Sequence, residues 1–184
     1  MIADDILMMA APRQPMIKAG LLFDHPVCVA AWLAMRVMHG ELVDKFTYGV
    51  GICPPGALDR IVPNDEAVPL IAAAAFADYY SIKDGRAGWS DITVCAAADE
   101  VATLTPQQIA GVLAYPFGGL KCNRVTAYVD GRNHDAVTFM NRFGFICEGA
   151  KRGMRDDGGE VLMFGLLKSE AQFNGVKLFP DEGM

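Results

Sequence analysis

The segment that most constrains the fold runs from Arg124 to Gly149 and reads as a strand, a turn, a helix and a second strand. Apolar residues alternate with other residues from Val125 to Val129, which predicts a strand with one buried face. Asp130-Gly131 is typical of a turn, and Asn133 is a residue type that caps the first turn of a helix. The segment therefore predicts where one strand ends and the next helix begins.

The helix in this segment has one apolar face. Its apolar residues recur at intervals of three and four positions, at Ala136, Phe139, Met140 and Phe143. Asp135 places a negative charge in the first turn, where the helix dipole favours it. Gly144 suits the left-handed conformation that ends a helix, and Phe145 begins the next strand.

The composition is that of a globular chain that fits one domain. The 184 residues are enough for a sizeable core, 52% of them are hydrophobic and 21% are charged, which excludes a disordered chain. The formal net charge is −6, whereas non-specific binding to nucleic acid needs a net basic face. We therefore expect no nucleic-acid partner, and the charge is compatible with a cationic substrate.

Cysteine and histidine spacing predicts neither disulfides nor a metal site. The five cysteines include no CxxC pair, which favours reduced, buried thiols and a cytoplasmic location. The three histidines show no ligand spacing, so no metal is expected. The N-terminus lacks the basic start of a signal peptide, and no uncharged window is long enough to cross a membrane.

Periodicity and capping signals predict two further helices. The first spans residues 26–38, after a capping aspartate and with a proline in its first turn. The second has the strongest start in the chain, because Thr105 caps it, Pro106 takes its first position and Gln108 completes a capping box. Pro116 is expected to distort or end this helix.

Alternating or continuous apolar runs predict strands at residues 20–24, 46–53, 68–80, 89–98, 121–130, 145–154 and 161–168. The third and fourth of these form a predicted hairpin, and so do the last two. Gly49 and Gly51 invite comparison with a dinucleotide-binding loop. We reject that site because the third glycine is missing and Pro54-Pro55 follows.

The resulting order is β–α–β–β–β–α–β–α–β–β, which predicts an α+β fold with a mixed sheet. The proline-containing residues 53–64 are predicted as a loop. We place one domain at residues 20–170, an N-terminal arm at 1–19 and a polar C-terminal tail at 171–184.

The strand–helix–strand segment resembles the C-terminal half of the GCN5-related N-acetyltransferases, the GNAT superfamily. Its members typically carry an asparagine, an alanine a few residues later, then Gly-Phe and Glu-Gly, which are here Asn133, Ala136, Gly144-Phe145 and Glu148-Gly149. The resemblance covers roughly residues 20–170. It implies a mixed, mostly antiparallel central sheet with helices on both faces.

Two other segments resemble a diverged bacteriophage and prophage branch of the superfamily. One is LLFDHP at residues 21–26, and the other joins Tyr115-Pro116-Phe117, Leu120, Cys122 and Arg124-Val125-Thr126. This resemblance implies a phage-encoded protein that is present in the host cytoplasm or in the virion.

The superfamily transfers an acetyl group from acetyl-CoA to an amine, and the resemblance implies the same reaction here. The amine acceptor would be a small molecule or a protein. The resemblance also implies that the strands at residues 89–98 and 124–130 splay apart. The pantetheine arm would pair with the first of these strands, near Val94, Cys95 and Ala96.

The resemblance further implies a site for the pyrophosphate on the amides that open the helix at Thr105, because such amides favour anions. The cofactor-binding residues implied at this end are Thr103, Leu104, Thr105 and Gln107. Asn133 and Phe139, from the next helix, would face the thioester end of the cofactor.

Some positions depart from the superfamily pattern. The nearest match to its pyrophosphate motif, Gln108 to Leu113, falls inside a helix and has leucine where a small residue is needed, so we interpret it as chance. Asp99 and Glu100, in the loop that replaces the motif, would repel a pyrophosphate unless they point away. Met140 stands where many members carry the tyrosine that protonates the leaving thiolate. Basic residues that either meet a CoA phosphate or balance nearby acids are Lys121, Arg124, Arg132, Lys151, Arg152 and Arg155.

A general base has to take a proton from the acceptor amine, and a carboxylate suits this task. Asp91 is our first candidate, Glu148 the second, and Tyr79 or Tyr80 the third. Each also has a structural interpretation: Asp91 as a strand-end cap, Glu148 as a solvated charge, and the tyrosines as sheet packing.

Three functions follow from these observations. The first is an acetyl-CoA-dependent N-acetyltransferase. The alternative is a GNAT-fold virion or structural protein without catalysis, in which residues 1–19 dock on neighbouring subunits of a homo-oligomer or virion assembly. The third is a binding module that holds acyl-CoA without turnover.

Overall fold

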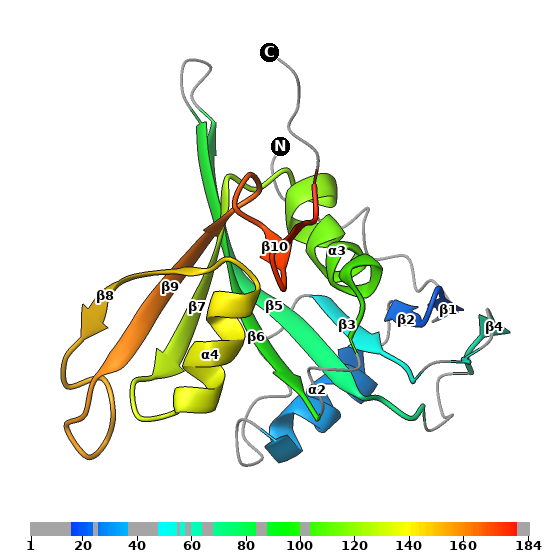
Figure 1. Cartoon of the computed structure of the whole chain (residues 1–184), viewed down its shortest axis with the longest axis horizontal. Coiled ribbons are helices and arrows are strands. Elements are labelled where there is room, and N and C mark those ends of the chain that lie inside the picture. The colour runs from blue at the N-terminus through cyan, green and yellow to red at the C-terminus, as the bar shows by residue number, and fades with distance from the viewer. Residues whose placement is uncertain are drawn as a thin grey trace.

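One mixed sheet dominates the computed structural model, which describes residues 16–23, 26–36, 48–54, 56–57, 60–63, 68–83, 88–99 and 104–179. Within these residues the sheet has nine strands in the order β4-β1-β2-β3-β5-β6-β7-β9-β8 (Figure 1). The strands are β1 (Met16–Lys18), β2 (Leu21–Phe23), β3 (Tyr48–Ile52), β4 (Arg60–Ile61), β5 (Ala72–Lys83), β6 (Gly88–Ala98), β7 (Arg124–Asp130), β8 (Ile146–Lys151) and β9 (Val161–Leu167).

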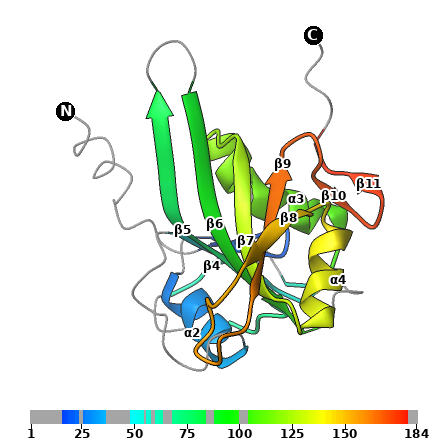
Figure 2. The same ribbon diagram turned by 90° about the vertical axis from the view of Figure 1, so that its left-hand side faces the viewer.

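Helices cover both faces of this sheet. Helix α2 (Pro26–Arg36) packs on one face, and α3 (Pro106–Ala114) and α4 (His134–Arg142) pack on the other. Figure 2 shows α2 and α4 on opposite sides of the strands. Each face of the sheet carries its own hydrophobic core, and the side chains of β5 alternate between the two. Ala73 and Ala75 face α2, while Ala72 and Ala74 face α3. The predicted mixed sheet with helices on both faces is confirmed.

The sheet is antiparallel except where β6 meets β7. These two strands run parallel and pair over only three positions, Asp91↔Arg124, Ile92↔Val125 and Thr93↔Thr126. Beyond Thr93 and Thr126 they diverge, which confirms the predicted splay (Figure 1). We call the space between the diverging strands the wedge.

The local start and stop signals are confirmed. Thr105 and Gln108 form the capping box of α3, and Asn133 caps α4 through a hydrogen bond from the Ala136 N–H. Pro116 lies in a π-helical turn, Tyr115–Gly119, in which α3 ends. Gly144 has a φ of 85° after α4, as the predicted left-handed cap requires.

Two glycines in β3 are explained by close packing. A Cβ at Gly49 would press on Val29 of α2, and a Cβ at Gly51 would press on Leu70. These glycines let the helix and the segment before β5 approach the sheet, which agrees with our rejection of a dinucleotide loop.

The edge strand β8 contains a bulge. Cys147 lies opposite Phe164 and Gly149 lies opposite Met163, so Glu148 is the extra residue. A bulge re-aims the side chain that it carries. Glu148 accordingly points to the sheet face that carries Arg124.

Three predictions about irregular regions were wrong. Met16–Lys18, placed in the N-terminal arm, forms β1, and Arg60–Ile61, placed in a loop, forms β4; residues 1–15 of the arm lie outside the described residues. The polar tail begins with a hairpin of β10 (Gln172–Phe173) and β11 (Val176–Lys177). Phe173 is only 1% exposed and packs against Phe143, so this hairpin is part of the core.

Two hairpin turns of the chain differ in their first central residue, and this difference leads to a prediction about stability. Ala19-Gly20 and Asn174-Gly175 both have positive φ at both central residues, as a type I′ turn requires. Asparagine adopts this conformation at a lower energetic cost than alanine. We expect Ala19→Asn to stabilise the protein by about 0.5–1 kcal/mol and Asn174→Ala to destabilise it by a similar amount. Urea unfolding of the two variants measures both changes in the free energy of unfolding. A change of the same sign in both variants would contradict the assignment of the two turns as type I′.

Candidate functional site

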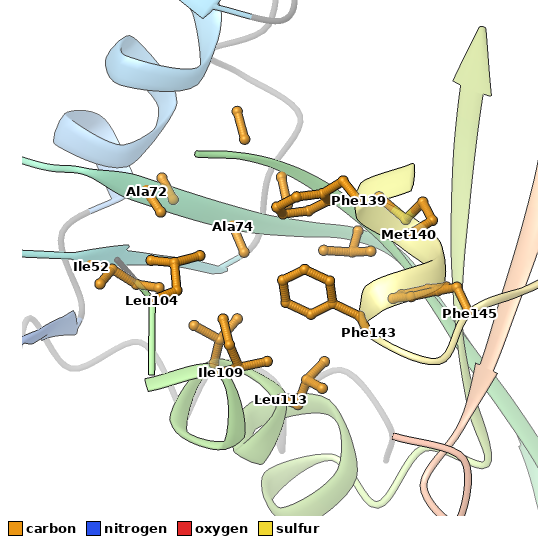
Figure 3. Close-up of a pocket in the computed structure, with 15 residues that line it drawn as sticks. Ile52, Ala72, Ala74, Leu104, Ile109, Leu113, Phe139, Met140, Phe143 and Phe145 are labelled. Carbon is orange, nitrogen blue, oxygen red and sulfur yellow. The ribbon is translucent and has the colours of Figure 1, made fainter. Parts of the chain in front are cut away.

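The wedge opens onto a small apolar cavity between α3 and α4. The cavity has a volume of about 50 Å³, and Figure 3 shows α3 and α4 contributing side chains from opposite sides. Four residues of the predicted cofactor site line it, namely Val94, Ala96, Leu104 and Phe139. Met140 also lines it and is buried, which supports its interpretation as a core residue.

Strand β6 has one paired edge and one open edge along the wedge. On one side, its residues from Val94 to Ala98 pair with β5. On the other side, they have no partner strand in the described part of the chain, because β7 has already diverged. An open strand edge presents N–H and C=O groups to whatever lies beside it.

Cys95, also predicted to bind the cofactor, differs from its neighbours Val94 and Ala96. It lies opposite Ala75, whose side chain belongs to the α2 face, so its thiol points away from the cavity. Burial raises the pKa of this thiol to about 11. Only the backbone of Cys95 therefore borders the wedge.

The amides at the start of α3 are partly engaged by hydrogen bonds within the helix's own capping box. The Thr105 N–H donates to Gln108 Oε1 at 3.0 Å, and the Gln108 N–H donates to Thr105 Oγ1 at 3.2 Å. Pro106 has no N–H, which leaves the amide of Gln107 as the first-turn donor outside the capping box. Thr103 and Glu100 lie outside the described residues. Asn133 is exposed and caps α4.

The match to a pyrophosphate motif inside α3 has a packing explanation. Gln108 belongs to the capping box, and a Cβ at Gly111 would collide with Leu21 of β2. These two residues thus attach the helix to the sheet, in agreement with the interpretation of this match as chance.

The structure brings the two predicted carboxylates together on the opposite sheet face. Arg124 Nη1 and Nη2 donate to the two oxygens of Glu148 at 3.1 and 2.7 Å, and its Nε lies 3.6 Å from Asp91 Oδ2. Thr126 Oγ1 donates to the same Asp91 oxygen at 2.6 Å. We call Asp91, Arg124, Thr126 and Glu148 the polar cluster. It lies along the paired part of β6 and β7, with Asp91 and Arg124 at the first of the three pairs and Thr126 at the last pair before the wedge.

A glycine in the neighbouring strand makes room for this cluster. A Cβ at Gly165 of β9 would overlap both the Glu148 carboxylate and the Arg124 guanidinium. The cluster therefore depends on groups from β6, β7, β8 and β9. Arg124 appeared in the sequence only as one of several basic residues, and Thr126 was not identified as part of a site.

The two carboxylates differ in how many of their oxygens already accept hydrogen bonds. Both oxygens of Glu148 are occupied by Arg124, and these hydrogen bonds raise the pKa of the guanidinium, against the opposing effect of burial. Asp91 uses Oδ2 for Thr126, while its Oδ1 is buried and has no hydrogen-bond partner among the described residues. The pKa of the Cys122 thiol is raised to about 11, mainly by burial and further by the charge of Asp91.

Three of the other basic candidates have local partners. Arg132 pairs with Asp130 and Asp157, and Arg155 pairs with the same two carboxylates. Lys151 Nζ lies 3.0 Å from the Tyr128 hydroxyl. These contacts fit the interpretation that basic residues balance nearby acids. Tyr80 lies opposite Asp91 in the β5–β6 ladder and is 61% exposed, so its ring extends into solvent.

The five cysteines form no disulfide with one another. Within the described ranges, no group of three or more His, Cys, Asp and Glu residues is arranged to hold a metal ion. The same ranges contain no helix of the length and apolar character needed to span a membrane.

Comparison with known proteins identifies the fold. The sequence matches no family model and no curated protein. Among solved structures, the chain is similar to a GNAT-family acetyltransferase from Bacillus anthracis, with 15% identity, a TM-score of 0.51, and coverage of 83% of this chain and 98% of that one. Arabidopsis thaliana NAA60 in complex with acetyl-CoA gives 13% identity, a TM-score of 0.49, and coverage of 65% and 75%. The fold is that of the GNAT acetyltransferases.

Proposed function

We propose that this protein is an N-acetyltransferase that transfers an acetyl group from acetyl-CoA to an amine. The observation that carries the proposal is the divergence of β6 and β7 after Thr93 and Thr126. It leaves the edge of Val94–Ala98 open beside an apolar cavity. The fold supports the same function by analogy, and the fold alone does not fix chemistry.

The residues that border the wedge fit the central part of acetyl-CoA. The backbone of Val94–Ala98 offers hydrogen bonds to the amides of a pantetheine arm, and the apolar lining of the cavity suits its methylene groups. The phosphate end has fewer donors, because the capping box of α3 leaves the Gln107 amide as the described first-turn donor. The cofactor, when bound, supplies an activated acyl thioester.

Asp91 is the proposed general base. It lies two residues before the point where β6 leaves β7, and its Oδ1 accepts no hydrogen bond from the described residues, whereas Arg124 occupies both oxygens of Glu148. In this role the Asp91 carboxylate would take the proton of the acceptor amine as the amine nitrogen bonds to the acetyl carbon, and the thioester C–S bond would break with release of CoA as a thiolate. Arg124 and Thr126 hold the carboxylate in place. The acceptor is a small molecule or a protein that presents an amine.

Calorimetric titration with acetyl-CoA, together with thermal unfolding, tests the proposal. A ligand that binds only the native state stabilises it by about 2.7 kcal/mol at a free concentration of 100 Kd. Ala96→Leu should weaken binding because it fills the side of the cavity, whereas Ala150→Leu, on an exposed strand position, should leave binding unchanged. If the wild-type protein shows no heat of binding and no thermal stabilisation with acetyl-CoA, the proposal is overturned.

Turnover separates the enzyme from a binding module. Release of CoA with a panel of a polyamine, a peptide N-terminus and a lysine peptide is the expected result. Binding without turnover of any amine would favour the module that holds acyl-CoA. Neither binding nor turnover would favour a GNAT-fold protein without catalysis. The comparisons lend no support to the bacteriophage branch or to a virion role.

A further inference from the structure

The sheet face that carries the polar cluster also carries exposed apolar side chains. Strand pairing places one residue from each of β5, β6, β7 and β9 in a single row across the sheet, namely Tyr80, Asp91, Arg124 and Leu167. Residues paired in this way point to the same face. Tyr80 is 61% exposed and Leu167 is 42% exposed. An apolar side chain therefore lies on either side of the Asp91–Arg124 ion pair.

The neighbouring row adds a third apolar side chain. Pairing across β7, β9 and β8 aligns Thr126 with Gly165 and Ile146, and Ile146 is 52% exposed. Single exposed apolar residues are common on protein surfaces, whereas a group of them around one polar site is a candidate interaction surface. We call Tyr80, Ile146 and Leu167 the apolar rim.

The apolar rim is open to solvent in the described part of the chain. Helix α2 packs on the same face of the sheet, but against the part of β5 that contains Ala73 and Ala75. All six residues of β8 are exposed. Sites for small molecules are concave and bury most of the ligand. An open face of this kind suits a larger partner that brings a surface of its own.

The charges around the polar cluster do not select a polycation. The carboxylates of Asp91 and Glu148 are balanced by the Arg124 guanidinium and by the ammonium of Lys151 on β8. Lys151 also lies 4.3 Å from the centre of the Tyr128 ring, so this aromatic surface already holds a cation. A polyamine is recognised by unbalanced negative charge. A polypeptide that brings one amine and apolar neighbours matches this surface better.

The positions of the rim residues bear on where the amine lies in that polypeptide. Tyr80 is one strand away from Asp91, and Leu167 is two strands away in the opposite direction. At the usual spacing of strands the two side chains are about 14 Å apart, which about four extended residues span. An amine at the end of a chain reaches only one side of the base. A lysine within a chain has neighbours that reach both sides.

We propose that the acceptor is a lysine within a polypeptide, flanked on both sides by apolar residues that contact the apolar rim. The inference rests on the proposed function, because it requires that the acceptor amine meets Asp91 on this face. In the reaction, the lysine nitrogen bonds to the acetyl carbon, its proton passes to Asp91, and CoA leaves as a thiolate. The rim residues bind the acceptor chain and take no part in the chemistry.

Two peptides that differ only beside the lysine test the proposal. Both have blocked ends and a single lysine, which is flanked on each side by leucines in one peptide and by serines in the other. The wild type is expected to acetylate the leucine peptide with a kcat/KM about 10-fold higher, because the leucines contact the rim. An equal or lower kcat/KM for the leucine peptide would overturn the inference.

Variants of the rim locate this preference on the protein. Tyr80→Ser and Leu167→Ser should each raise KM for the leucine peptide about 5- to 10-fold with little change in kcat, since only binding of the acceptor is lost. The calorimetric affinity for acetyl-CoA should be that of the wild type. Ile61→Ser is the matched control, because Ile61 is 62% exposed on the outer strand at the other side of the sheet. Wild-type KM values in both rim variants would contradict the proposal.

A second copy of the chain and another segment of the same chain are the competing occupants of this face. Light scattering and urea unfolding of the same variants are expected to show the oligomeric state and the unfolding midpoint of the wild type. A wild-type dimer that Leu167→Ser converts to a monomer would assign the face to a second copy. Midpoints far below that of Ile61→Ser in both rim variants would assign it to another segment of the chain. Either result would overturn the inference.

The outcomes also separate this inference from the proposed function. If the wild type binds no acetyl-CoA, both are overturned. If it binds acetyl-CoA and acetylates a polyamine or a peptide N-terminus with a higher kcat/KM than the leucine peptide, the function stands and only the inference is overturned.

Discussion

Replacing Asp91 by asparagine is expected to lower kcat by about 10²- to 10⁴-fold, because asparagine keeps the shape of the side chain and cannot accept a proton. The affinity for acetyl-CoA should remain close to that of the wild type, since the Asp91 side chain lies on the sheet face opposite the cavity. Steady-state rates with saturating acetyl-CoA, together with calorimetric affinities, measure the two quantities separately. A change in kcat without a change in affinity is the signature of a group that acts in the transition state.

Glu148→Gln is the matched control, because it alters the other carboxylate of the same polar cluster. Its kcat should fall less than about 10-fold, since both oxygens of Glu148 are already held by Arg124. A larger loss in Glu148→Gln than in Asp91→Asn would reverse the two roles. Wild-type rates in both variants would leave neither residue as the base.

Phe173→Ala is expected to lower the free energy of unfolding by about 3–5 kcal/mol, as the loss of a large buried aromatic side chain does. Phe173 packs against Phe143 with ring centroids 5.2 Å apart, and Phe143 packs against Phe139 at 4.5 Å. The ring therefore supports the side of α4 that lines the cavity. Urea unfolding, with the slope and midpoint determined separately, measures the loss.

Val176→Ala, in the same hairpin, is the control for this prediction. Val176 is 53% exposed, so its truncation should change the free energy of unfolding by no more than about 0.5 kcal/mol. Similar small losses in both variants would show that the β10–β11 hairpin does not pack on the core in solution.

Local signals in the sequence predicted the parts of the fold that depend on neighbouring residues. The capping box of Thr105 and Gln108, the Asn133 cap and the left-handed Gly144 each satisfy hydrogen bonds within one helical turn. Short strands lack such signals, because a strand of two or three residues shows no periodicity. Asn174-Gly175 was nevertheless available as a hairpin signal, and it would have placed β10 and β11.

The site was predicted as a set of residues and not as an arrangement. Asp91 and Glu148 stood in the sequence as two alternatives, and the structure joins them through Arg124. That contact depends on the parallel register of β6 and β7 and on the bulge at Glu148, which involve residues far apart in the chain. The two predictions for Thr105 were in competition, since a capping box uses the same amides that a pyrophosphate would need.

The bulge at Glu148 also affects how the sheet meets other proteins. Strand β8 is one outer strand of the sheet, and the bulge interrupts its ladder at Glu148. The outer strand at the other side, β4, has only two residues. Long, flat outer strands invite aggregation by adding a strand from another molecule, and both features work against it. In the described part of the chain, both outer strands therefore disfavour edge-to-edge aggregation. A partner protein is expected to bind a sheet face or a loop instead.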